Sequence, residues 1–207
     1  MALEISPRPP IPPDVSSTPP TSNAQGGVVH EGLRPALSLE ELLEHLVSLK
    51  LLSEDQAQDV EARATTLKSA VLKDRVGSVR SQAAARYDVT PAELVAAARV
   101  PRPDGGKGFL TEDLVAQALA KVSGTPYLKV DPLRIDNDLV SKTLSRPFAR
   151  RHVVIPVDRD ADGLVLAVAD PFDSTLRESL VNTIQEPLRM VVAAKCDIVA
   201  IIDRVYG

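Results

Sequence analysis

Two short aliphatic runs separated by a turn constrain the fold of this 207-residue chain more than any other feature. The runs cover residues 153–157 and 164–169. An Asp-Gly pair lies between them, and an Asp-Pro pair follows the second run directly. Runs of this length that are rich in Val and Ile and bounded by Asp, Gly and Pro are typical of β-strands. The pattern therefore predicts an antiparallel hairpin with strands over residues 152–158 and 164–169.

A third strand and two helices complete the C-terminal domain that the pattern predicts. We expect the strand over residues 188–193 and the helices over residues 174–184 and 197–205. The order is then strand, strand, helix, strand, helix within residues 149–207. Such an order predicts an α+β domain with an antiparallel hairpin, a third strand and helices on one face of the sheet.

The preceding residues, 37–123, have the pattern of a helical subdomain. Ser38 is followed three residues later by Glu41, and Ser53 by Gln56, and both pairs are capping boxes that start a helix. Leucines then recur at the three- and four-residue spacing of one helix face. Two similar helix starts follow at Thr90-Pro91 and Thr111-Glu112.

Residues 1–36 and 124–148 lack the patterns of a buried core. Residues 1–36 hold seven prolines in the first 20 positions, which predicts a disordered tail because proline fixes φ and removes a hydrogen-bond donor. The tail is either a spacer or a proline-rich docking peptide. Residues 124–148 are expected to form a connector with a short helix near residues 137–144.

Composition and charge exclude several classes of protein. A net charge of -4 argues against general nucleic-acid binding, which usually goes with a basic excess. The one cysteine excludes an internal disulfide. The longest apolar runs have about six residues, whereas a membrane span needs roughly 20. We therefore expect a cytoplasmic protein with no signal peptide and no direct membrane insertion, which reaches a membrane through a partner.

Motifs for catalysis and for metal binding are missing from the sequence. Residues 105–108 read Gly-Gly-Lys-Gly, but a glycine follows the lysine where a nucleotide-binding loop needs Ser or Thr. The three histidines, His30, His45 and His152, are isolated from one another, and none has a second His, Cys or acidic residue at a standard zinc spacing. The prediction is a protein without catalytic residues, cofactor or metal.

Two further features allow alternatives. Residues 82–94 resemble a DNA-binding helix-turn-helix, with basic side chains nearby at Lys68, Lys73, Arg75 and Arg80. The helix that would read DNA carries Glu93, several alanines and Arg99, and so lacks most side chains that contact base edges.

Cys196 follows Lys195 at a predicted helix start, where a lowered pKa would make it reactive. The alternative is a small buried apolar residue.

Several motifs in order resemble one known family. They are the arginine-rich start and Ala-Asp-Pro end of residues 149–173, the Gly-Phe-Leu-Thr helix entry from residue 108, the Gly-Thr-Pro-Tyr connector from residue 124 and the closing helix that ends in Tyr-Gly. Together these motifs resemble the N-terminal domain of type II secretion and type IV pilus assembly ATPases, over residues 37–207. The chain ends where those ATPases continue into their motor domains.

The resemblance implies a non-enzymatic adaptor or regulatory domain that docks to a protein partner, such as the inner-membrane platform of a secretion or pilus machine. The first helix pair is the predicted partner face, through Glu41, Leu42, His45, Leu46 and Leu49. The edge of the short sheet is a second candidate, because its free N–H and C=O groups can accept a strand.

Some members of this family bind cyclic di-GMP through a motif that starts Arg-Leu-Gly, has a later Gly and ends in Gln. In the first copy here, Glu41 replaces the arginine, Lys50 the later glycine and Ala64 the glutamine. A carboxylate at the arginine position would repel phosphate. The second copy keeps Arg99 and Gly108 but has proline in place of the first glycine. A cyclic di-GMP sensor that uses these two residues is therefore the alternative function.

Overall fold

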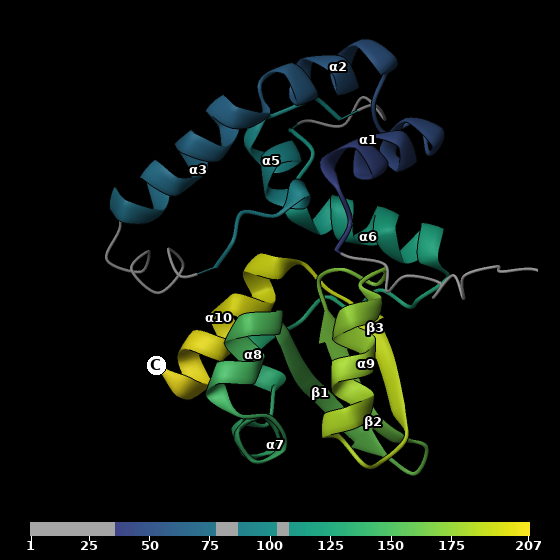
Figure 1. The fold of residues 1–207 in the computed structure, drawn as a ribbon, viewed down its shortest axis with the longest axis vertical. Helices are drawn as coiled ribbons and strands as arrows, with labels where there is room; N and C mark the ends of the chain where they lie inside the picture. Colours follow the sequence, from purple (N-terminus) through teal and green to yellow (C-terminus); the bar gives the residue numbers. More distant parts are fainter. Residues whose placement is uncertain (1–35, 78–86, 103–107) are drawn as a thin grey trace, which may run out of the picture. The chain divides into compact units, whose positions relative to one another are not determined.

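The computed structural model describes residues 36–77, 87–102 and 108–207, and Figure 1 shows their arrangement. The first part is helical, with α1 (Leu39–Ser48), α2 (Glu54–Ala62), α3 (Ala64–Gly77), α5 (Pro91–Ala97) and α6 (Glu112–Ser123). The second part contains the 3-10 helix η1 (Pro132–Arg134), α7 (Asn137–Thr143), α8 (Arg146–His152), β1 (Val154–Asp160), β2 (Gly163–Val168), α9 (Ser174–Thr183), β3 (Leu188–Val192) and α10 (Lys195–Tyr206). The predicted α+β class is confirmed.

The predicted capping boxes start the first two helices. Ser38 Oγ accepts from the Glu41 amide at 3.2 Å, and the Ser38 amide donates to Glu41 Oε2 at 3.0 Å. Ser53 and Gln56 make the same two bonds at 3.2 and 2.9 Å. Each box satisfies two backbone groups that have no partner within the helix, so each helix begins where the sequence predicts.

A core of aliphatic side chains holds the helical part together. Its fully buried members come from several helices and include Leu42, Leu46, Val60, Val95 and Val115, each 0% exposed. The apolar stripe of α1 therefore faces the other helices of its own chain. The sequence pattern predicts one helix from the Ser53 capping box to about Val71, but Arg63 leaves helical geometry and separates α2 from α3.

The sheet has the order β1-β2-β3, and the predicted hairpin is confirmed. β1 and β2 are antiparallel, with Val154 opposite Val168 and an irregularity after Pro156. β3 runs parallel to β2, with Leu164 opposite Leu188, and α9 is the crossover between them. In Figure 1, α9 lies over the sheet, and α8 lies next to α10.

The backbone conformation at position 163, where β2 begins, requires a glycine. Its φ is +119°, and a Cβ built there would lie 2.2 Å from the carbonyl oxygen of Pro187. The same carbonyl accepts a hydrogen bond from the Leu164 amide at 2.9 Å. Glycine thus lets β2 approach the segment that leads into β3.

The second core lies around this sheet. Ile155, Leu164 and Leu166 are each 0% exposed, and they belong to the same buried cluster as Ile198 and Ile202 of α10. β1 and β2 both contact α10, so segments that are far apart along the chain share this core.

The first strand starts two residues later than predicted because an unpredicted helix, α8, precedes it. Ser145 caps this helix by accepting from the Phe148 amide at 3.4 Å, and Pro147 occupies its first turn. Val153 then ends the helix in the left-handed region, with φ +50°. A Ser followed by a Pro is a helix-start signal that the sequence does contain.

Some predictions lie outside the described residues or stay untested. The structure does not describe residues 1–35, which hold the predicted tail. It also omits residues 103–107 of the Gly-Gly-Lys-Gly loop and residues 82–86 of the helix-turn-helix segment, so these predictions cannot be compared with it. The division of residues 37–207 into helical subdomain, connector and C-terminal domain stays a prediction. Among the described residues, no helix combines the length and the apolar character that crossing a membrane requires.

Candidate functional site

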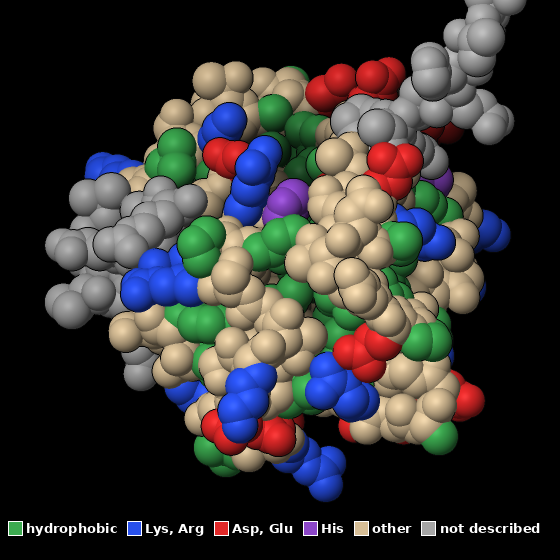
Figure 2. All heavy atoms as spheres, turned by 60° about the horizontal axis from the view of Figure 1, so that its bottom comes forward, with side chains coloured by type: hydrophobic (Ala, Val, Ile, Leu, Met, Phe, Trp, Pro, Cys, Tyr) green, Lys and Arg blue, Asp and Glu red, His purple; other side chains and the backbone are tan. Residues whose placement is uncertain are grey.

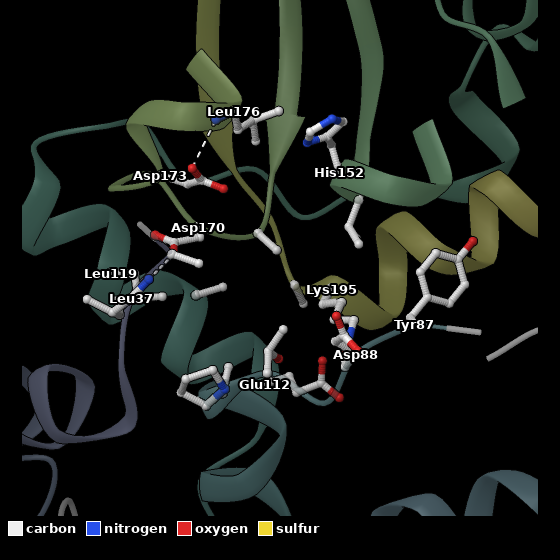
Figure 3. Close-up of a pocket in the computed structure, with 18 of the residues that line it drawn as sticks. Leu37, Tyr87, Asp88, Glu112, Leu119, His152, Asp170, Asp173, Leu176 and Lys195 are labelled. Carbon is white, nitrogen blue, oxygen red and sulfur yellow. Dashed lines mark hydrogen bonds between the residues drawn. The ribbon is translucent and has the colours of Figure 1, made fainter. Parts of the chain in front are cut away.

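A cavity of about 410 Å³, which we call the junction cavity, lies where the helical part meets the sheet part. One wall comes from α1, α5 and α6, and the other comes from the end of α8 and from the starts of α9 and α10. About half of its lining residues are apolar, and ten of the 22 are polar or charged (Figure 3). A cavity of this size and character is the usual form of a small-molecule site.

A buried ion cluster adjoins the junction cavity, which Lys195 lines. The side chain of Lys195 is 4% exposed, and its Nζ donates to Glu93 Oε2 at 2.6 Å and to the backbone carbonyl of Asp88. Glu93 also pairs with the guanidinium of Arg75 and accepts from the Thr90 amide at 2.8 Å. The cluster thereby joins α3, α5 and α10.

Burial and pairing compete in setting the charges of this cluster. Burial would raise the pKa of Glu93, but Lys195, the Thr90 amide and Arg75 together hold it below the ordinary value. Burial also lowers the pKa of Lys195, against the opposing effect of Glu93. Several donors converge on one carboxylate, so we assign Glu93 as charged and Lys195 as its ammonium partner.

Glu112 is a second buried carboxyl next to the cluster. Its pKa is raised, first by burial and then by the charge of Glu93. Its Oε2 accepts from the Cys196 amide at 3.2 Å, so the side chain caps the start of α10. A carboxyl at a helix N-terminus is favoured by the helix dipole, and its role here is accordingly structural.

The two aspartates at the other end of the junction cavity bind backbone amides. Asp170 accepts from the Leu37 amide at 2.6 Å and from the Phe172 amide at 2.9 Å. Asp173 caps α9 by accepting from the Leu176 amide at 2.9 Å, and Figure 3 shows both aspartates on the same side of the cavity. Asp170 therefore holds the entry of α1 against the turn between β2 and α9, and Asp173 fixes the start of α9.

The end of α8 places Arg150, Arg151 and His152 along the cavity. Burial, followed by the charge of Arg151, lowers the pKa of His152. Its ring lies 4.6 Å from that of Phe148. The cavity can therefore bind a small molecule through apolar contacts with basic groups at one side. Among the described residues, no group of His, Cys, Asp and Glu is placed to hold a metal ion.

The predicted partner residues of α1 do not share one exposed face. Leu42 and Leu46 are 0% exposed, and Leu49 packs against the same helical core. Glu41 caps the helix, and the ring of His45 stacks on that of Phe172 at 5.5 Å. Leu42 and Leu46 are thus inaccessible to a partner in this structure, and partner binding by this helix stays a prediction.

The two residues of the nucleotide alternative are close together. The guanidinium of Arg99 lies 4.9 Å from the centre of the Phe109 ring, next to Gly108. A bridge between Pro101 and Phe109 brings these segments together, and the Arg102 amide donates to the Gly108 carbonyl at 3.2 Å. Arg99 and Gly108 both have positive φ, 53° and 117°. In the first motif copy, Lys50 also has positive φ, 58°, at the position where the family has glycine.

Both interpretations of Cys196 need correction. The residue is exposed, so it is not a buried apolar residue. Desolvation of its sulfur by the surrounding groups, together with the charges of Glu112 and Asp197, raises the pKa of the thiol to about 12. The acidic neighbours outweigh the helix start and Lys195, on which the expectation of a lowered pKa depends.

The DNA-binding alternative loses one of its basic side chains, because Arg75 is buried and pairs with Glu93. In addition, the helix that would read DNA, α5, places Leu94 and Val95 in the core. Figure 2 shows Lys and Arg side chains mixed with Asp and Glu on the face that it presents. A broad basic patch, which nucleic-acid binding needs, is therefore not seen on that face.

Sequence reasoning missed the ion cluster. Its members, Arg75, Glu93 and Lys195, are separated by 18 and 102 residues. No spacing rule links charges so far apart, although an acid three residues after Thr90 did mark Glu93 as part of a helix start.

Comparisons with known proteins agree with the resemblance in the sequence. Residues 123–207 match the family model described as the MshEN domain. The type IV pilus assembly ATPase PilB of Myxococcus xanthus (strain DK1622) is 26% identical over 100 residues, which are 48% of this chain and 18% of that protein. The matched part therefore spans less than a fifth of that relative.

Solved structures also resemble this chain. A structure of MshE with cdg has a TM-score of 0.52 and 24% identity, and the match covers 80% of this chain and 98% of that one. The N-terminal domain of XpsE has a TM-score of 0.48 and 20% identity, with 84% and 100% covered. The first of these likenesses supports the fold.

Proposed function

We propose that this chain, whose residues 123–207 match the MshEN domain, is a non-enzymatic docking or regulatory module of a type II secretion or type IV pilus machine. The match over residues 123–207 is the observation that carries the proposal. Domains of this type are the N-terminal parts of the motor ATPases and do not themselves hydrolyse ATP. The partner is then a protein of the same machine, reached on the cytoplasmic side of the inner membrane.

The partner face that the geometry favours is a groove between α1 and α2, which we call the acidic groove. Its volume is about 470 Å³, and its floor includes Leu43 and Val47. Glutamates surround it, and all four are exposed: Glu40, Glu44, Glu54 and Glu61. This face differs from the set predicted from the sequence, because it uses the side of α1 that points away from Leu42 and Leu46. An apolar floor with an acidic rim fits a basic amphipathic segment.

The experiment is a binding measurement between the full chain and the cytoplasmic part of the platform protein from the same organism. Reversing two rim charges, Glu44→Lys with Glu61→Lys, should weaken binding about tenfold or more and reduce its dependence on salt. Glu178→Lys on α9 is the matched control, because Glu178 is exposed and lies outside the groove. Equal binding by the control and the double variant would remove the acidic groove from the proposal. Lack of binding by the unaltered chain would contradict docking to that partner.

A second candidate function is binding of cyclic di-GMP. It is favoured by the placement of Arg99, Phe109 and Gly108, which offers a guanidinium, an aromatic ring and an open glycine backbone on one loop. Guanine and phosphate are the groups that such an arrangement contacts. The similar structure of MshE was solved with cdg, an observation that concerns MshE itself.

Calorimetric titration of the full chain with cyclic di-GMP tests this second candidate. We expect saturable heat that Arg99→Ala abolishes and that Arg134→Ala, at another exposed arginine, leaves unchanged. Saturable heat that survives Arg99→Ala would place the nucleotide elsewhere. Absence of heat with the unaltered chain would leave docking as the function.

A further inference from the structure

The outer edge of β3 carries backbone groups that have no partner among the described residues. The backbone N–H and C=O of Val192 point away from β2: the amide donates to the Pro126 carbonyl, and the carbonyl accepts from the Leu128 amide, both at 2.8 Å. In a parallel ladder, every second residue directs its N–H and C=O to the same side. The backbone N–H and C=O groups of Leu188 and Met190 therefore point outward too. Within the described part of the chain, no backbone hydrogen bond to either residue is found on that side.

A groove runs beside this free edge. It has a volume of about 450 Å³ and is lined by Val165 and Val191 of the sheet, by Val181 of α9 and by Pro126. Val181 is 61% exposed, so its side chain is accessible from the groove. A side chain that entered the groove would cover Val181 and Val191 together.

Two arginines lie along the same groove. Arg189 pairs with Asp160, whereas Arg177 on α9 is exposed and forms no ion pair with the other described residues. Arg177 precedes Val181 by four helical residues, about 6 Å along the axis. Two residues of a strand span about 6.6 Å, so two side chains on one face of a strand match this spacing.

We propose that the outer edge of β3 accepts an extended segment of a partner protein as a fourth strand of the sheet. On its groove-facing side the segment carries an aliphatic residue against Val181 and, two positions away, an Asp or Glu against Arg177. Its backbone pairs with the outward N–H and C=O groups of Leu188 and Met190, continuing the pairing that residues 126–128 begin at Val192. This is recognition by strand addition.

The charge of the edge argues for a different partner over a second copy of this chain. Edge-to-edge pairing of two copies would bring Arg177 of each close to the same junction, where like charges repel. An acidic segment removes this repulsion and supplies the missing counter-ion. The β3 edge and the acidic groove between α1 and α2 are separate surfaces of opposite charge, so this inference does not depend on the proposed function.

A short peptide tests the edge directly. The probe is acetyl-Thr-Glu-Thr-Val-Thr-Glu-Thr-amide, which places a Glu two residues from Val in either strand direction. Amide NMR spectra of the full chain should show saturable shifts at Leu188 and Met190, and both amides should exchange more slowly with solvent. A peptide with Lys in place of both Glu residues should bind at least about tenfold more weakly.

Variants separate the edge from non-specific binding. Val181→Lys should weaken the peptide about tenfold, because it removes the burial of one aliphatic side chain. Leu133→Lys is the control, since Leu133 is 91% exposed and does not line this groove. Unchanged shifts in the core of each variant verify folding. The proposal is overturned if the Glu peptide gives no saturable shift at Leu188 and Met190, or if the Lys peptide or the Val181 variant binds equally well.

Discussion

The helical part and the sheet part of this chain are stabilised by interactions of different range. In the helical part, α1 and α2 each begin with a capping box that joins residues three positions apart. In the sheet part, the register joins residues 14 and 24 positions apart, Val154 with Val168 and Leu164 with Leu188. Local signals therefore specify where helices begin, whereas the sheet depends on contacts between distant segments.

The junction between the two parts is stabilised by a third kind of interaction, the pairing of buried charges. Arg75 and Glu93 belong to the helical part and Lys195 to the sheet part, and all three are largely buried. A buried charge that loses its partner is costly, so we expect this cluster to couple the two parts in one unfolding transition.

The largest effect is expected from Glu93→Gln. This change keeps the shape of the side chain but leaves Arg75 and Lys195 buried without a counter-charge, at a cost of about 3–5 kcal/mol in the free energy of unfolding. Urea denaturation measures it. Glu61→Gln, at an exposed position, is the control and should change stability by less than about 0.5 kcal/mol. A loss below about 1 kcal/mol for Glu93→Gln would mean that the cluster does not couple the two parts.

The next effect compares the two cores through Leu46→Ala and Leu166→Ala. Both leucines are 0% exposed, and each truncation should cost about 2–5 kcal/mol through lost burial and the cavity left behind. Amide hydrogen exchange on each variant shows where protection falls. We expect the slowest amides of both parts to lose protection in either variant. Loss confined to the part that carries the substitution would instead make the two cores independent.

A smaller effect is expected at a helix start. Ser53→Ala removes the oxygen that accepts from the Gln56 amide, and should cost about 1 kcal/mol. Exchange should quicken in the first turn of α2 and stay unchanged in the sheet. Ser69→Ala in α3 is the matched control, because that hydroxyl bonds the Thr65 carbonyl within the helix and its loss should be nearly neutral. Equal effects of the two substitutions would argue against the capping box as a source of stability.

The last prediction concerns the reactivity of the Cys196 thiol at the start of α10. With the pKa of Cys196 raised to about 12, alkylation by iodoacetamide at pH 8 should be slower than that of free cysteine by about three orders of magnitude, roughly the ratio of their thiolate fractions. The rate should rise with pH up to the pKa. Glu112→Gln removes a negative charge beside the sulfur, lowers the pKa and speeds the reaction. A fast reaction at pH 8 in the unaltered chain would contradict the raised pKa.

Much of the fold was predictable from particular residues. Ser38, Ser53 and Thr111 mark helix starts, and the Asp-Gly pair before residue 164 marks the hairpin turn. α8 was missed because its signal, Ser145 followed by Pro147, lies inside a short segment that also contains arginines and a histidine. Short helices of this kind have little periodicity to detect.

The candidate site was much less predictable. The apolar stripe of α1 indicates that Leu42 and Leu46 are buried against something, but it does not distinguish the same chain from a partner. The structure assigns both to the helical core. The outward face of β3 also follows from its place in the sheet, which the sequence of β3 alone does not define.

The sequence by itself determined the local features of this protein: its helix starts, its hairpin turn, its aliphatic cores and its resemblance to the N-terminal domains of secretion and pilus ATPases. These depend on residues a few positions apart, and so they can be recognised along the chain. The tertiary structure alone decided which apolar faces are inside, which strand forms the edge, and that Arg75, Glu93 and Lys195 meet. The physical reason is that burial and charge pairing depend on distances in space, which are set by the whole fold and not by spacing along the chain.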